Sequence, residues 1–243
     1  MNNNLLVLAL IGFSLTSTAQ ASLVARDGGM VYDDVNNITW AADANLFQTQ
    51  AASNPNLVSE IIAANGGVIH DTPNGYDTVT NSGVRFLTSA DFNTSNSQMS
   101  WWGAQAWANN LSLGGYTDWA LPTTDPAVVG HNQTGSQLGN LFYTQLGGVQ
   151  NTSITTTHNA DYNLFSNVQD YYWSSSEYAP IPVRAWNFVT GSGSQIHSYK
   201  INQSYAWAVR PGDVAAVPLP GAVWLFLSGL IGLMSLKRRN KIA

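Results

Sequence analysis

Two apolar segments, one near each end of the chain, limit what can fold between them. Residues Leu5 to Leu15 form the first apolar run, and residues 222–236 form the second. Of the 243 residues, about 190 remain between the terminal regions, a length that suits one domain with a sizeable core. We therefore expect a signal peptide at 1–21, a folded domain at 22–214 and a distinct C-terminal segment at 217–243.

The N-terminal apolar run has the length of a signal-peptide core. Polar residues follow it, and Ala19-Gln20-Ala21 then forms an A-x-A cleavage pattern, with Ala19 and Ala21 as its small residues. The pattern predicts cleavage before Ser22 and export of the protein. A buried N-terminal helix is the alternative interpretation.

The C-terminal segment has three parts. Val217-Pro218-Leu219-Pro220-Gly221 comes first, and its two prolines keep the chain extended. The apolar part, 222–236, predicts a helix about 22 Å long, short of the roughly 30 Å hydrocarbon core, so that it spans a membrane only with help from its flanks. Four basic residues follow and would stay on the cytoplasmic side: Lys237, Arg238, Arg239 and Lys241.

This tripartite tail resembles the PEP-CTERM sorting signals of Gram-negative bacteria, in the variant that begins VPLPA. Gly221 stands where that variant has alanine, a change from one small residue to another. The resemblance implies recognition by an exosortase, a membrane cysteine transpeptidase, and delivery to the cell surface or a biofilm matrix after a transient stay in the inner membrane. A plain membrane anchor is the alternative.

Composition excludes several partners and activities. Charged residues make up 9% of the chain, against roughly 25% in ordinary soluble domains. All fourteen acidic residues but only five of the nine basic ones precede the basic tail, which argues against nucleic acid as a partner. Cysteine is absent, so that disulfides, thiolate nucleophiles and cysteine-ligated metals are excluded.

Residue patterns predict one α+β domain, with helices early and an antiparallel, aromatic-rich sheet late. We expect a hairpin of 29–33 with 38–40, and helices after Asn54-Pro55, from Ser100 to Leu111 and from Ser136 to Leu146. Strands are expected at 171–173, 185–189, 195–197 and 205–209, with a turn at 191–193. Long loops are expected within 67–99 and at 125–134.

Several motifs in this domain occur in a recognisable order. They are Gly28-Gly29-Met30-Val31-Tyr32-Asp33, Gly114 to Trp119 with Leu121-Pro122-Thr123, Tyr172-Trp173-Ser174-Ser175-Ser176, Ala185-Trp186-Asn187-Phe188 and Trp207 to Pro211. Together they resemble the Lcl C-terminal domain family, named for a module of a collagen-like bacterial adhesin. Ala120 replaces the arginine of the family pattern. The resemblance implies a C-type-lectin-like fold and a role in adhesion.

We expect the motif residues to be structural. In a chain with so few charges, Asp118 and Arg210 would form a semi-buried ion pair. Trp119, Trp173, Trp186 and Trp207 lie in alternating patterns that favour core packing over stacking on sugar rings. The full set is Asp118, Trp119, Leu121, Pro122, Thr123, Trp173, Ser174, Ser175, Trp186 and Arg210.

No spacing indicates a catalytic or metal site. Asp33 with Asp34, or Asp118 with Glu177, could supply an acid and a base, but turn roles explain the first pair better. The four histidines lie far apart and form no metal motif. The side-chain oxygens of Asp33, Asp34, Asn36 and Asn37 could hold calcium, yet no calcium-binding signature accompanies them. We expect no cofactor.

These observations favour an exported, non-enzymatic surface or matrix protein that binds extracellular polysaccharide. Its expected partners are the secretion machinery, an exosortase and, through the C-terminal helix, the membrane. A secreted polysaccharide hydrolase and a structural matrix component without a ligand are the alternatives.

Overall fold

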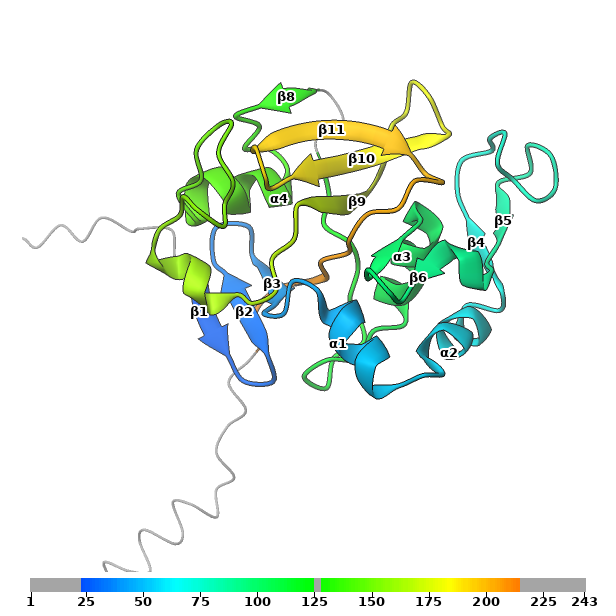
Figure 1. The fold of residues 1–243 in the computed structure, drawn as a ribbon, viewed down its shortest axis with the longest axis horizontal. Helices are drawn as coiled ribbons and strands as arrows, with labels where there is room; N and C mark the ends of the chain where they lie inside the picture. Colours follow the sequence, from blue (N-terminus) through cyan, green and yellow to red (C-terminus); the bar gives the residue numbers. More distant parts are fainter. Residues whose placement is uncertain (1–22, 125–127, 215–243) are drawn as a thin grey trace, which may run out of the picture.

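The computed structural model describes residues 23–124 and 128–214, which form an α+β domain with antiparallel sheets (Figure 1). The cleavage residues Ala19 and Ala21, the sorting motif 217–221, the segment 222–236 and the basic residues after it lie outside the described residues. Within the described ranges, no helix is long and apolar enough to cross a membrane.

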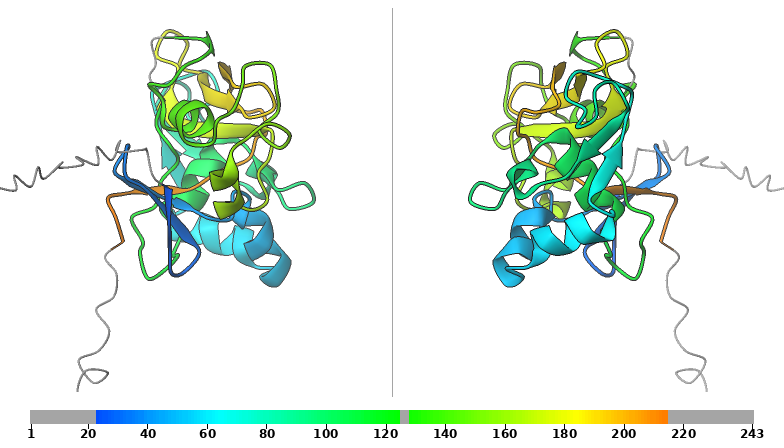
Figure 2. Two further views of the ribbon diagram at one scale, coloured as in Figure 1. Left: turned by 90° about the vertical axis from the view of Figure 1, so that its left-hand side faces the viewer. Right: turned by 90° about the vertical axis from the view of Figure 1, so that its right-hand side faces the viewer.

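The first sheet joins the two ends of the described chain. Strands β1 (Leu23–Arg26), β2 (Met30–Asp33), β3 (Ile38–Ala41) and β12 (Val209–Pro211) lie in the order β1-β2-β3-β12. The predicted hairpin is confirmed, because Met30 faces Ala41 and Asp33 faces Ile38 in the antiparallel β2–β3 register. Figure 2 shows β1 to β3 in blue with the orange β12 beside them.

The described residues form four α-helices. The predicted helices at 54–65 and 100–111 are confirmed as α2 (Leu57–Ala64) and α3 (Trp101–Asn109), and Ser100 caps α3 by accepting a hydrogen bond from the Gly103 backbone N–H. The third predicted helix is present as α4 (Gln137–Asn140), followed by a π-helical turn, Leu141–Gln145. Helix α1 (Leu46–Ser53) was not predicted, because its one buried side chain, Phe47, gives no periodic apolar stripe.

The second sheet lies above α1, α2 and α3 in Figure 1 and has the order β8-β11-β10-β9. It contains β8 (Gly130–His131), β9 (Tyr171–Glu177), β10 (Arg184–Val189) and β11 (Ser194–Tyr199), so that three predicted late strands and the turn at 191–193 are confirmed. The predicted strand at 205–209 is wrong. Only Val209 belongs to a strand there, and that strand, β12, pairs with β3 in the first sheet.

The stretch expected to form long loops contains short ordered elements. Strands β4 (Val68–His70) and β5 (Val84–Phe86) pair with each other, as do β6 (Phe92–Asn93) and β7 (Gln98–Met99), with a 3-10 turn at Ser89–Asp91 between the pairs. A second 3-10 turn, Ala160–Leu164, precedes β9. The long loop that remains, residues 71–83, lies between β4 and β5.

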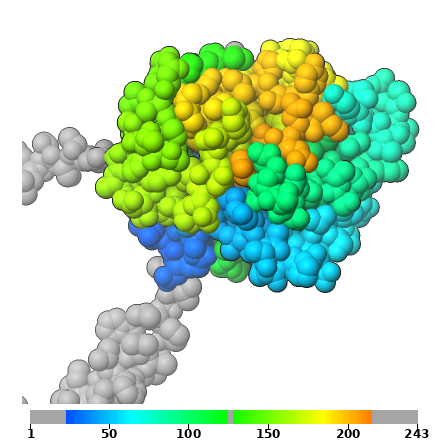
Figure 3. Space-filling view, viewed as in Figure 1, coloured from blue at the N-terminus to red at the C-terminus, as the bar shows by residue number. Residues whose placement is uncertain are grey.

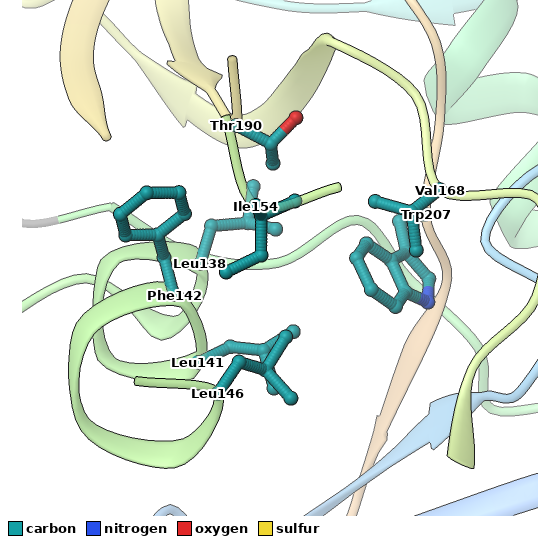
Figure 4. Close-up of a pocket in the computed structure, with 8 residues that line it drawn as sticks. All are labelled: Leu138, Leu141, Phe142, Leu146, Ile154, Val168, Thr190 and Trp207. Carbon is teal, nitrogen blue, oxygen red and sulfur yellow. The ribbon is translucent and has the colours of Figure 1, made fainter. Parts of the chain in front are cut away.

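Aromatic side chains dominate the core, as expected for a chain without disulfides. Trp40, Trp107, Trp173 and Trp207 are at most 2% exposed. The Trp207 ring lies 5.3 Å from Trp40 and 5.0 Å from Phe165, between centroids. Beside Trp207 lies a small cavity lined almost entirely by apolar side chains (Figure 4). Such a lining provides too few polar partners to bind water firmly.

Candidate functional site

One group of side chains combines a basic residue, a histidine and three aromatic rings at the end of the second sheet. The antiparallel register places Arg184 opposite Tyr199 and Trp186 opposite His197. Residues two apart on a strand point to the same face, so these four share one face of β10 and β11. Tyr178 joins them because its backbone N–H donates to the Arg184 carbonyl. We call these five residues the Arg184 cluster.

The rings of the Arg184 cluster hold one another in fixed orientations. The Tyr178 and His197 rings stack with centroids 3.9 Å apart. The Trp186 ring meets Tyr178 edge to face at 5.3 Å. The Arg184 guanidinium lies 4.3 Å above the Tyr199 ring, a cation–π contact. These contacts leave Tyr199 41% exposed, so the cluster is open to solvent on that side.

Hydrogen-bonding capacity in the Arg184 cluster is incompletely used. Burial, and then the charge of Arg184, lower the pKa of His197, which favours the neutral ring. Its Nδ1 can therefore accept from Arg184 Nη1, 3.1 Å away. Trp186 is fully buried, yet its Nε1 has no hydrogen-bond partner among the described residues, and neither has Arg184 Nε. Buried donors without a partner are uncommon in folded proteins.

Arg184 also differs from the other cations of the domain. Four of the five basic residues in the described ranges form ion pairs with carboxylates: Arg26, Arg85, Lys200 and Arg210. Arg184 has no carboxylate within ion-pair distance among the residues that the structure describes. Its guanidinium instead contacts His197 Nδ1 and the Tyr199 ring.

A second group, the Lys200 cluster, is buried between the β4–β5 loop and the end of β11. Lys200 Nζ lies 2.6 Å from Asp71 Oδ2 and 2.8 Å from Glu177 Oε2. The side chains of Lys200 and Asp71 are fully buried, and that of Glu177 is 24% exposed. Figure 3 shows the orange end of β11 near the cyan loop segment. We define the Lys200 cluster as Lys200, Asp71 and Glu177.

The predicted ion pair of Asp118 with Arg210 is confirmed. Arg210 Nε and Nη2 donate to the two Asp118 oxygens at 2.8 and 3.0 Å, a bidentate geometry. The Arg210 side chain is 9% exposed and that of Asp118 is 49% exposed, so the burial is mostly on the arginine side. The Arg210 guanidinium also lies 4.1 Å from the Tyr116 ring.

The remaining motif residues are buried or hydrogen-bonded within the domain. Trp119, Leu121 and Trp173 are buried in the core. The Pro122 carbonyl accepts a hydrogen bond from the Ser175 N–H, which ties the Leu-Pro-Thr segment to β9. Thr123 bonds to Gln137 at the start of α4, and the Ser174 carbonyl accepts from Trp101 Nε1. Trp186 differs from the others because it is buried within the Arg184 cluster, apart from the main core.

The acidic residues considered for catalysis lie in different places. Asp118 pairs with Arg210, whereas Glu177 pairs with Lys200. Asp33 is fully buried and accepts hydrogen bonds from the Val35 and Asn36 backbone N–H groups, which is the expected turn role. It also accepts from Gln145 Nε2, across 112 residues of sequence.

The oxygens considered for calcium are partly engaged in hydrogen bonds. Asp33 accepts from several donors, and Asn37 Oδ1 accepts from the Tyr32 hydroxyl at 3.0 Å. Within residues 23–124 and 128–214, no group of three His, Asp or Glu side chains is arranged to hold a metal ion.

Acid should weaken two ion pairs, Asp118 with Arg210 and Asp213 with Arg26. Hydrogen bonds from Arg210 and Arg26 lower the pKa values of Asp118 and Asp213, respectively. A carboxyl whose pKa is lower in the folded state stabilises the fold above its unfolded pKa of about 3.9 and loses that contribution as the pH falls through the folded value. We expect the urea concentration at the unfolding midpoint to decrease as the pH is lowered below about 4, and we expect a smaller decrease in Asp118→Asn. The same decrease in Asp118→Asn as in the wild-type chain would contradict the assignment of this ion pair.

Sequence reasoning missed both clusters. Arg184, Tyr178, Tyr199 and Lys200 belong to no motif, and Asp71 was assigned to a loop. The one signal in the sequence was the scarcity of basic residues. With only five before the tail, each could have been considered as a partner of a carboxylate or as a ligand-binding group. Comparison with protein-family models, with curated proteins and with solved structures gives no match to this chain.

Proposed function

We propose that this chain is an exported surface or biofilm-matrix protein whose domain binds extracellular polysaccharide through the Arg184 cluster, without turning it over. The single observation that supports this most is the Arg184 guanidinium, which has no carboxylate partner among the described residues and is held over the exposed Tyr199 ring. Sugars present hydroxyl groups to hydrogen-bond donors and C–H faces to aromatic rings, so they match this combination of groups.

Export, exosortase sorting and the C-type-lectin-like fold belong to the same proposal. The terminal sequence motifs support the first two. The α+β architecture, with the first three strands and the last strand in one sheet, is compatible with the third. Fold alone does not define a ligand, so the binding proposal depends on the Arg184 cluster.

Hydrolysis is less well supported by the geometry. A glycosidase needs two carboxyl groups about 5 to 9.5 Å apart that both reach a substrate. Asp71 and Glu177 do lie together, but both are bonded to Lys200, and the Asp71 side chain is fully buried.

Binding should be tested with the full-length chain, using soluble dextran as a neutral probe and polygalacturonate as an acidic one. We expect saturable binding to at least one polysaccharide without release of sugar. Arg184→Ala should weaken it by about tenfold or more, since a charged hydrogen bond contributes about 1.5–3 kcal/mol. Tyr199→Ala should weaken it as well, because it removes the ring that holds the guanidinium in place.

Tyr171→Ala is the matched control for this experiment, because Tyr171 is 46% exposed at the other end of β9 and should leave affinity unchanged. Equal affinity of the Arg184→Ala, Tyr199→Ala and Tyr171→Ala variants would refute the assignment of the site. Release of reducing sugar would instead favour a hydrolase.

A further inference from the structure

The Lys200 cluster places an amine and a carboxyl group in a water-poor site where they can react. Lys200 Nζ is 2.6 Å from Asp71 Oδ2, although the residues are 129 apart in sequence. Both side chains have no exposed surface. The Lys200 backbone is fixed at both ends, because its N–H donates to Val183 and its carbonyl accepts from Trp101. We propose that Lys200 and Asp71 condense to form an intramolecular isopeptide bond.

Neighbouring groups are arranged to assist this condensation. Glu177 Oε2 lies 2.8 Å from Lys200 Nζ, within reach for proton transfer, and Glu177 Oε1 accepts from the Thr72 N–H. Trp102 Nε1 donates to Asp71 Oδ2 at 2.9 Å, and Asn74 Nδ2 donates to the same oxygen at 3.1 Å. Two donors on the carboxyl oxygen stabilise the negative charge that develops there when the amine adds to Cγ.

The reaction balances without any other reagent. Glu177 takes a proton from the Lys200 ammonium, and the free amine attacks Asp71 Cγ. A new Nζ–Cγ bond forms and one Cγ–O bond breaks. The oxygen of the broken bond leaves as water, with one proton from Glu177 and one from the attacking nitrogen. An ammonium and a carboxylate thus become a neutral amide and one water, and Glu177 ends in its initial state.

Burial favours the product over the ion pair. One ammonium and two carboxylates place three charges in a site of low polarity, where desolvation is costly. Condensation removes two of these charges. Fixing the partners in contact also raises their effective concentration far above that of free solutes. In this cysteine-free chain, the bond would tie the β4–β5 loop to the end of β11, a role that disulfides often have in exported proteins.

The proposal does not depend on polysaccharide binding and has its own readout. The full-length chain, purified after expression, should be digested with trypsin after denaturation. We expect the fragment 27–85, which contains Asp71, to remain joined to the fragment that begins at Ala185, with cleavage blocked after Lys200. The joined species should be lighter than its two parts by one water, about 18 Da. Separate, unshifted fragments from the wild-type chain would overturn the proposal.

Two variants complete the test. Glu177→Gln keeps both reacting groups but removes the proton acceptor, and it should yield separate fragments, as should Lys200→Arg, which keeps the positive charge. Circular dichroism would verify that each variant is folded before digestion. A joined species in Glu177→Gln, in the same yield as in the wild-type chain, would exclude Glu177 as the proton-transfer group.

Discussion

Replacing Lys200 with methionine is expected to lower the free energy of unfolding by about 3–5 kcal/mol, because it leaves Asp71 and Glu177 close together without a cation. Methionine has a similar length and needs little repacking, so that the loss reports mainly on charge. Without the amine, neither the ion pair nor the proposed amide can form. Urea unfolding at pH 7, followed by tryptophan fluorescence, measures the change.

A double variant separates charge from packing. Lys200→Met with Asp71→Asn removes the fully buried carboxylate together with the cation, so it should be more stable than Lys200→Met alone. Breaking a buried ion pair costs more than replacing it completely, because the remaining charge is not compensated. A Lys200→Met variant with the urea midpoint of the wild-type chain would contradict this account, as would a double variant less stable than the single one.

The sequence predicted the elements whose signals are local. Ser100 and Ser136 are N-caps ahead of apolar residues, and both begin helices where expected. The strand expected at 205–209 shows the limit of this reasoning. Its alternating aromatic pattern is typical of a strand, but Trp207 is used as a core side chain, Tyr205 forms only an isolated bridge with Tyr172, and a strand begins only at Val209. Packing against distant segments determines the backbone conformation here, and a local residue pattern does not indicate such packing.

The two clusters were harder to predict because they depend on contacts between distant segments. Asp118 could be matched with Arg210 because both belong to motifs and few other charges were available. Lys200 offered no such guide, since its partner Asp71 lies in a polar loop 129 residues earlier. The Arg184 cluster depends on the β10–β11 register, and a register shifted by one residue would separate Arg184 from Tyr199.

Trp207→Ala is expected to be similarly destabilising, by about 3–5 kcal/mol, because it removes a large, fully buried ring from the junction of the two sheets. The Trp207 ring contacts Trp40 in β3 and Tyr172 in β9, and its Nε1 donates to the Ala41 carbonyl at 2.8 Å. The site already borders a cavity (Figure 4), so truncation would enlarge an existing void. The free energy of unfolding from urea titration is again the measurement.

Trp207→Phe distinguishes lost packing from the lost hydrogen bond. Phenylalanine keeps most of the ring contacts but leaves the buried Ala41 carbonyl without this donor, which costs about 1–3 kcal/mol. If packing dominates, the phenylalanine variant should recover more than half of the loss seen in Trp207→Ala. Equal losses in the two variants would mean that the hydrogen bond to Ala41, and not the ring volume, stabilises the contact between the sheets. The exposed Tyr171→Ala variant should leave the urea midpoint unchanged and serves as the control.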